Sequence, residues 1–221
     1  AWDWMLTELP QFFGAGNNKL DDDNQLLFTM VRKLAHRTAE MHIALSRERR
    51  DRRFVPVEYN GDFSVWLKNR LIYQFDARYN LLKRKLRRLK KHFREMGQAV
   101  IDQKDFIINF ILSFDEEELK GERIRIHGDY HLGQILMHED DFYILDFEGE
   151  PESTIRDRQV KQSPLKDVAG LFRSFHYALF VVLKNSHQSG SIPEKEINLA
   201  RQMYQRMTSS FMEEYQQLAF N

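Results

Sequence analysis

Cysteine is absent from the sequence, which excludes disulfides, thiolate metal ligands and a cysteine nucleophile. Its absence also fits an intracellular protein, and we expect a cytoplasmic one. Long apolar runs are absent too, so no segment is predicted to span a membrane. Lys and Arg total 33 and Asp and Glu total 33, so no overall field favours nucleic acid or a membrane surface as a partner.

The chain has 221 residues, 42% hydrophobic and 30% charged, which is ordinary for a globular protein with one sizeable core. It begins without Met, and we interpret it as part of a longer chain. Apolar residues recur at helical spacing over most of the length. This pattern predicts helices at 1–9, from about 24 to 47, from after Asp62 to about 96, from after Gly97 to about Phe114, at 165–184 and at 194–219. The acidic residues 21–23 are predicted to cap the second of these helices.

The stretch "RIRIHGDYHLGQILMHEDDFYILDFEGEP", residues 123–151, has a different period. Ile124 and Ile126 alternate with arginines, which predicts a strand. "QILMH" and "FYILDF" predict a second and a third strand around a turn at 139–141. The predicted fold class is therefore α+β, mainly α-helical, with one small β-hairpin that carries the polar loops.

Asp129, Gln134 and Asp146 lie at the ends of these predicted strands. A strand–loop–strand hairpin brings the residue before it and the residue after it to one end, so we expect the three side chains to converge. Gln134 and Asp146 offer the oxygen ligands that Mg²⁺ prefers. Asp129 would act nearby as a base or as an orienting group for a hydroxyl nucleophile.

The spacing of these groups is that of a kinase catalytic loop, in which H-R-D-x-x-x-x-N is followed by D-F-G. Here "HGD" at 127–129 is followed after four residues by Gln134, and then by "DFE" at 146–148. The amide is Gln in place of Asn, so its carbonyl oxygen lies one methylene further out. This spacing predicts the carboxyl-terminal lobe of a kinase fold.

The longer motifs add a resemblance to a family. "HGDYHLGQ" resembles the catalytic motif of the small-molecule kinases related to aminoglycoside phosphotransferases. With "DFEGEP" and "SPLKDVAGLFRSFHYA", it resembles the maltokinases, including those fused to trehalose synthase. The opening "AWDWMLTEL" resembles the segment that follows the hinge between the two lobes. The resemblance is strongest from 124 to 177.

The resemblance implies phosphorylation of maltose by ATP, giving maltose 1-phosphate for glucan synthesis. It implies that Asp129 is the catalytic acid, that Gln134 and Asp146 are the metal ligands, and that ATP and Mg²⁺ are the cofactors. The sequence has no phosphate-covering glycine loop and no strand with the matching lysine, so residues 1–221 are interpreted as a single domain, the carboxyl-terminal lobe alone. The implied partners are an amino-terminal lobe, a sugar and a trehalose synthase domain. The apolar surface facing that lobe is expected near Trp2, Trp4 and Met5.

Five further residues are supporting or substrate-binding candidates: His127, His131, Glu148, Asp167 and Arg173. Each has a structural alternative. His127 is interpreted as a structural hydrogen-bonding residue rather than a proton carrier. Asp167 and Arg173 are explained equally well by a helix cap and a buried ion pair. Glu148 is open between metal, sugar and solvent.

Two other functions stay open at this point. One is a kinase-fold phosphotransferase for another hydroxyl, such as an aminoglycoside or an amino alcohol. The other is a non-catalytic module that packs on a fused trehalose synthase. The basic run "KRKLRRLKKHFR" is typical of a polynucleotide patch, but its leucines and phenylalanine keep one apolar face, and we favour a solvated helix surface.

Overall fold

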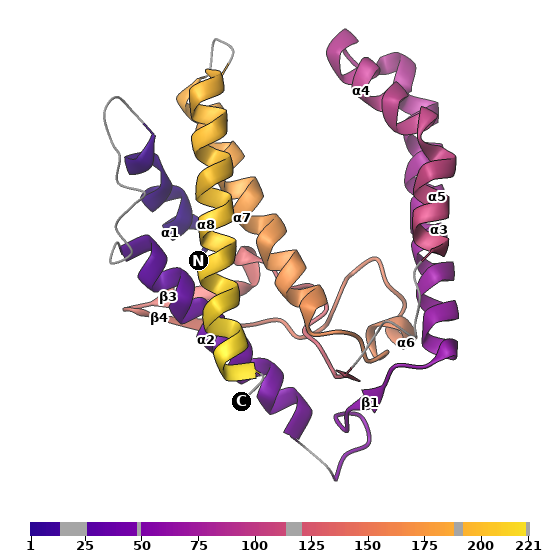
Figure 1. Ribbon diagram of the computed structural model, residues 1–221, viewed down its shortest axis with the longest axis vertical. Coiled ribbons are helices and arrows are strands. Elements are labelled where there is room, and N and C mark those ends of the chain that lie inside the picture. The colour runs from indigo at the N-terminus through magenta and orange to yellow at the C-terminus, as the bar shows by residue number, and fades with distance from the viewer. Residues whose placement is uncertain (14–25, 48–49, 114–120, 188–191, 220–221) are drawn as a thin grey trace. The chain divides into compact units, whose positions relative to one another are not determined.

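A computed structural model describes residues 1–13, 26–47, 50–113, 121–187 and 192–219 (Figure 1). The predicted caps at 21–23 lie outside these residues. The described chain divides into two compact units, residues 1–56 with 123–221 and residues 57–122. Whether the whole chain forms one domain stays a prediction. No helix in the described ranges is both long enough and apolar enough to cross a membrane.

The core of the larger unit lies among four helices, α1 (Trp2–Glu8), α2 (Leu26–Arg47), α7 (Leu165–Ser186) and α8 (Glu194–Ala219). The predicted helices at 1–9, 24–47, 165–184 and 194–219 are confirmed. α2 buries residues at i, i+3 and i+4 spacing and packs along α8, which lies beside α7 (Figure 1). Each fully buried aliphatic or aromatic side chain stabilises the fold by about 1.5–3 kcal/mol. The central members of this core are Leu27, Phe28, Leu34, Leu171, Phe175, Met203, Met207 and Phe211.

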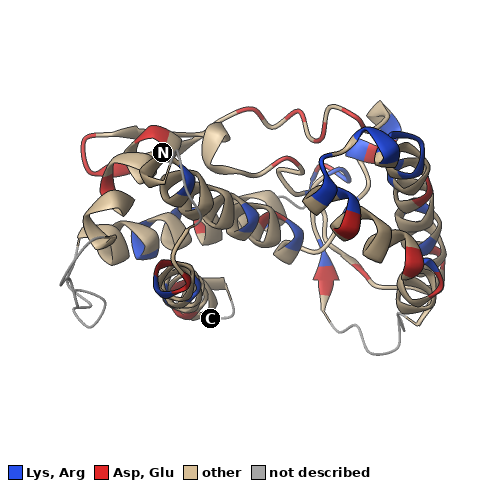
Figure 2. Cartoon of the chain, turned by 90° about the horizontal axis from the view of Figure 1, so that it is seen from above, with Lys and Arg blue, Asp and Glu red and all other residues tan. Residues whose placement is uncertain are grey.

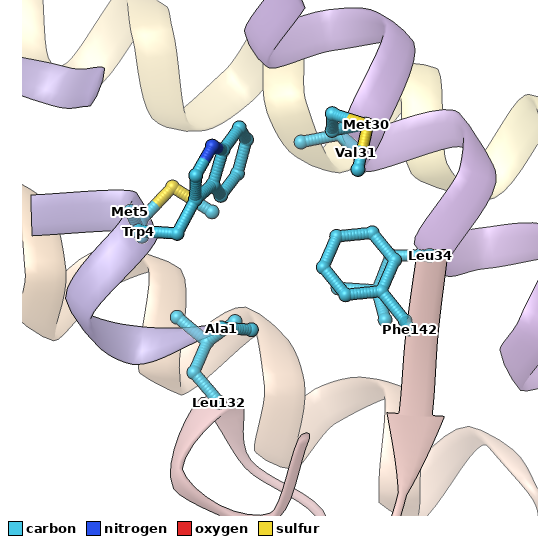
Figure 3. A pocket seen from close by; sticks show the side chains of 8 residues that line it. All are labelled: Ala1, Trp4, Met5, Met30, Val31, Leu34, Leu132 and Phe142. Atoms are coloured by element: carbon cyan, nitrogen blue, oxygen red, sulfur yellow. The ribbon is translucent and has the colours of Figure 1, made fainter. Parts of the chain in front are cut away.

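The residues expected at an exposed surface facing a second lobe belong in part to this core. Met5 is 1% exposed, so its predicted exposure is wrong. Trp2 and Trp4 are half-buried and pack against the core, and the Trp4 ring lies edge-on to Phe142 at 6.4 Å. Figure 3 shows that Trp4 and Met5 line a small gap together with apolar residues of α2 and β4. The gap has no room for a water molecule. This gap belongs to the core packing and is no ligand site.

A hairpin of β3 (Ile135–His138) and β4 (Asp141–Ile144) confirms the predicted second and third strands. The strands are antiparallel, with Ile135 opposite Ile144 and His138 opposite Asp141. Glu139 turns the chain with φ 53°, in the left-handed region that tight turns require. Ile135 and Phe142 point into the core, so the register is fixed by burial of one face.

The first predicted strand, around Ile124 and Ile126, is confirmed only at its start, because extended pairing ends at Ile124. β2 is Glu122–Arg123 and pairs with β1 (Val57–Glu58) in a separate two-stranded sheet. Ile124 exchanges two backbone hydrogen bonds with Gln162, each of 3.0 Å, in an isolated bridge. Its partner is therefore a loop before α7 and not the hairpin.

The smaller unit contains α3 (Gly61–Lys85), α4 (Lys91–Asp102) and α5 (Lys104–Leu112). Asn60 caps α3 by accepting a hydrogen bond from the Phe63 backbone amide. The helix predicted from after Asp62 is confirmed as far as Lys85. Its predicted end at about 96 and the break at Gly97 are wrong, because a short 3₁₀ turn, Leu86–Arg88, and extended Leu89 interrupt it earlier. Gly97 lies inside α4, where the lack of a side chain lets the helix pack closely on Leu86.

The basic run lies at the end of α3, across the 3₁₀ turn and at the start of α4. Its eight cations are all exposed, and none forms an ion pair with a described residue: Lys83, Arg84, Lys85, Arg87, Arg88, Lys90, Lys91 and Arg94. Figure 2 shows the blue residues gathered on this part of the unit. The exposure agrees with a solvated helix surface.

An ion pair joins α2 to the hairpin of the larger unit. The Arg37 guanidinium donates to both carboxylate oxygens of Asp141, at 2.8 and 2.6 Å. These hydrogen bonds hold the pKa of Asp141 well below its usual range. Both side chains are slightly more than a third exposed, and water and salt therefore screen most of the attraction between the two charges.

We expect Asp141→Asn to lower the free energy of unfolding by about 0.5–1 kcal/mol at pH 7. The native pKa is depressed below the unfolded value of about 3.9, so the contribution is complete above that value. It disappears as the pH falls through the native pKa, so the difference between the variant and the wild type in urea titrations should narrow as the pH is lowered below about 4. Asp140→Asn is the control, because its carboxylate makes no ion pair with a described residue. A difference that grows towards low pH would contradict this account.

Candidate functional site

The hairpin brings two of the predicted site residues together. Gln134 comes directly before β3 and Asp146 follows β4, and the Gln134 Nε2 donates to Asp146 Oδ2 at 2.9 Å. The Leu145 amide also donates to the Gln134 carbonyl at 2.9 Å, which extends the ladder by one step. The predicted convergence of Gln134 and Asp146 is therefore confirmed.

Asp129 is positioned by a different element. It belongs to the segment 127–134, which we call the HGD loop, and the buried Asp167 of α7 holds that loop. Asp167 is 1% exposed, and its carboxylate accepts from the backbone amides of His127 at 2.8 Å and Gly128 at 2.9 Å. Two charge-assisted hydrogen bonds fix the backbone just before Asp129. Asp167 is also in the first turn of α7, where a negative charge is favourable.

One face of α7 contacts the HGD loop at three points. Besides Asp167, Ser174 Oγ accepts from the Leu132 amide at 3.2 Å. Gly170 lies against the Tyr130 carbonyl, where an added Cβ would be 2.6 Å from the oxygen. Residues 167, 170 and 174 are spaced i, i+3 and i+7, so they share one side of the helix. The helix acts as a rigid support for the loop.

His127 joins the HGD loop to the end of the hairpin. Its ring is 1% exposed, and Nε2 donates to the Leu145 carbonyl at 2.7 Å. Nδ1 accepts from the Asp129 amide at 3.3 Å, so both ring nitrogens have a partner. The ring also lies 4.9 Å from Phe147. These contacts support the structural interpretation of His127 over proton transfer.

Three residues with positive φ shape the site: Asp146 at 63°, Gly128 at 88° and Gly149 at 77°. An added Cβ on Gly128 would lie 3.3 Å from the Gly149 Cα, so glycine lets the HGD loop and the 146–149 turn approach closely. Asp146 is not glycine, and a non-glycine residue in this region stores backbone strain of the order of 1 kcal/mol. Such strain is typical of residues whose side chain must point in a required direction.

The remaining predicted site residues, Asp129, His131, Glu148 and Arg173, have fewer contacts with the rest of the site. Asp129 is half-buried, with Oδ2 3.8 Å from His131 Nε2, and His131 Nδ1 accepts from the Gly133 amide. Glu148 is exposed and makes no hydrogen bond or ion pair within the described ranges. Arg173 is exposed on α7, and its guanidinium stacks on Tyr177 at 4.7 Å and donates to the tyrosine hydroxyl. The structure does not bring Arg173 to the HGD loop.

Two supporting residues on α2 escaped the sequence analysis. His42 Nε2 lies 3.1 Å from Asp167 Oδ2, and Thr38 Oγ1 lies 2.7 Å from the Tyr130 hydroxyl. Burial raises the pKa of Tyr130 well above its usual range, so this hydroxyl stays protonated. Polar residues at i and i+4 on the buried face of an amphipathic helix were the signal that could have found them.

Gln134 and Asp146 fit a magnesium ion better than a transition metal. Both side chains carry an oxygen ligand, and the exposed Asp146 carboxylate accepts from the Gln134 NH₂ group, so the amide would have to turn over to offer its carbonyl oxygen to the same ion. No cluster of three His, Cys, Asp or Glu side chains able to hold a metal occurs among the residues described. A two-ligand site suits Mg²⁺, because this ion keeps several waters or phosphate oxygens in its coordination shell.

Comparisons with known proteins show which fold carries this site. No family model matches the chain. A stretch of 60 residues, 27% of the chain, is 35% identical to a glucosamine kinase of Streptacidiphilus jiangxiensis and covers 14% of that protein. A structure of glucosamine kinase in crystal form B superimposes on 98% of the chain with a TM-score of 0.69 at 20% identity. A second, in complex with glucosamine, ADP and inorganic phosphate, gives a TM-score of 0.66 at 21% identity.

The chain shares the fold of part of these kinases. It covers 46% and 45% of the two solved chains, so it spans less than half of their length. This likeness confirms the predicted fold class, a mainly helical kinase-like architecture with small two-stranded sheets. The fold likeness alone assigns no substrate to the present chain.

We expect Gly170→Ala to lower the free energy of unfolding by about 1–3 kcal/mol, because the methyl group would displace the Tyr130 carbonyl. The loss should appear although alanine favours a helix by about 1 kcal/mol over glycine. Gly97→Ala is a matched control in another helix, since its methyl group would meet the movable Leu86 side chain. A larger loss in urea denaturation for Gly97→Ala than for Gly170→Ala would contradict the supporting role of α7.

Proposed function

We propose that this chain is the carboxyl-terminal lobe of a two-lobed kinase that transfers the terminal phosphoryl group of ATP to a sugar hydroxyl. The observation that carries the proposal is the Gln134–Asp146 pair on the hairpin, next to an HGD loop held by Asp167. The spacing of these groups along the chain is that of kinases, and the fold is that of part of the glucosamine kinases.

Asp129 would orient the attacking hydroxyl and accept its proton. Its backbone is fixed by His127 and by the two amides bound to Asp167, so the half-buried carboxylate stands on a rigid loop. Positioning and electrostatic stabilisation supply most of the catalysis in phosphoryl transfer, which makes such rigidity useful. The neighbouring His131, 3.8 Å from Asp129, would interact with the carboxylate electrostatically.

Gln134 and Asp146 would hold the magnesium ion that neutralises charge on the phosphate oxygens. The left-handed backbone of Asp146 directs its carboxylate from the end of β4, and the Gln134 amide lies beside it. Nucleotide binding would need further groups from the proposed amino-terminal lobe. That lobe, and a fused trehalose synthase domain, remain proposed partners.

Two sugars are candidate substrates. Maltose is favoured by the resemblance of "HGDYHLGQ" and "DFEGEP" to maltokinases. Glucosamine is favoured by the local sequence match and by the solved structure that holds glucosamine. Aminoglycosides and amino alcohols are the wider alternative, and a non-catalytic module is disfavoured by the strained backbone at Asp146.

We expect the full-length protein to phosphorylate maltose or glucosamine with ATP in a panel that also contains glucose, trehalose and an aminoglycoside. Asp129→Asn should lower kcat about 10²–10⁴-fold, the range for loss of a positioned base, with little change in sugar binding. Asp140→Asn, on the distant hairpin turn, is the control. A kcat within a few fold of wild type for Asp129→Asn would remove Asp129 from the mechanism, and no turnover with any sugar would refute the function.

The metal site makes a separate prediction. Asp146→Ala should raise the Mg²⁺ concentration needed for half-maximal activity steeply or abolish turnover, because it removes the anionic ligand. Gln134→Asn should have a milder effect, since it keeps the carbonyl and changes only its reach. Activity is measured over a Mg²⁺ titration for each variant. Equal and small effects of both substitutions would place the metal elsewhere.

A further inference from the structure

A chain of buried hydrogen bonds leads from the last helix to the HGD loop. The Tyr215 hydroxyl of α8 lies 2.8 Å from His42 Nδ1, and His42 Nε2 lies 3.1 Å from Asp167 Oδ2. Asp167 in turn accepts from the backbone of the HGD loop. Tyr215, His42 and Asp167 are all buried, and they come from α8, α2 and α7. One hydrogen-bonded chain therefore links α8, through α2, to the Asp167 carboxylate of α7.

The direction of each hydrogen bond follows from the chemistry of the partners. A carboxylate only accepts, so His42 must donate to Asp167 through Nε2–H. In a neutral imidazole the other nitrogen then carries a lone pair and can only accept. The Tyr215 hydroxyl is the group placed to donate to it. Each donor in this chain faces an acceptor, as buried polar groups require.

The environment of Tyr215 keeps its hydroxyl a donor. Burial, and next the negative charge of Asp167, raise the pKa of Tyr215 to about 12. The phenol thus stays protonated at neutral pH. Its ring lies 5.8 Å from the His42 ring at 86° and stacks on Phe211 of the same helix at 6.1 Å. Packing fixes the ring, and the hydroxyl adds one directed hydrogen bond.

We propose that Tyr215 is a positioning residue, whose hydroxyl donates to Nδ1 of His42, keeps the Nε2–H of that ring directed at Asp167, and so holds the Asp167 carboxylate against the HGD loop. Tyr215 lies in none of the motifs around Asp129 and Asp146, and it acts on them only through His42 and Asp167. The role rests on the proposed function for its effect on turnover. The tautomer itself does not depend on that function.

Tyr215→Phe tests the role, because phenylalanine keeps the stacked ring and removes only the hydroxyl. In the full-length enzyme we expect kcat to fall about 3- to 10-fold, the equivalent of one neutral hydrogen bond, with both KM values changed less than twofold. Tyr204→Phe is the matched control on α8, since the Tyr204 hydroxyl makes no hydrogen bond with a described residue. An unchanged kcat in Tyr215→Phe, or an equal fall in Tyr204→Phe, would overturn the positioning role.

The tautomer is measured separately by ¹⁵N NMR of histidine-labelled full-length protein, with His42→Gln to assign the resonance. We expect a proton on Nε2 and none on Nδ1 of His42 in the wild type, and a shift of the Nδ1 resonance in Tyr215→Phe. A proton on Nδ1 in the wild type would overturn the inference whatever the activity. If the NMR result holds while no sugar is phosphorylated, the proposed function fails and the hydrogen-bond chain stands.

Discussion

The Asp167 carboxylate is the interaction on which the candidate site depends. A buried carboxylate is costly unless its oxygens are hydrogen-bonded, and here two backbone amides and one imidazole satisfy it. The same bonds fix the backbone of the HGD loop just before Asp129. The site is therefore built on a polar contact inside an apolar core, and the surrounding helices exclude the water that would compete for the carboxylate.

Two independent supports meet at this site. The hairpin positions Gln134 and Asp146 through its ladder, and its register follows from burial of one face. α7 positions Asp129 through residues 167, 170 and 174. His127 connects the two supports by bonding to Leu145 at the hairpin end. A small shift of either support would separate the proposed base from the proposed metal ligands, which explains why close backbone contacts recur at Gly128 and Gly170.

Local patterns predicted the helices of the larger unit and the hairpin, because amphipathic periodicity and strand alternation depend on near neighbours in the chain. The pairing of Gln134 with Asp146 followed from hairpin geometry. The first predicted strand was placed too far along the chain, because its partners, β1 and Gln162, are distant in the sequence and no local pattern indicates such pairing. The exposure of Met5 and the break at Gly97 failed for the same reason, since the burial of Met5 in the core and the packing of Gly97 on Leu86 are tertiary contacts. Tyr215 carries no local signal that separates it from other core residues.

The most direct measurement is a crystal structure of the full-length protein with a sugar substrate, a non-hydrolysable ATP analogue and Mg²⁺. We predict an Asp129 carboxylate oxygen about 2.5–3.0 Å from one sugar hydroxyl. We also predict Mg²⁺ at about 2.0–2.1 Å from oxygens of Gln134 and Asp146. A sugar bound away from Asp129, or a metal held by other side chains, would contradict the proposal that this lobe carries the phosphoryl-transfer site.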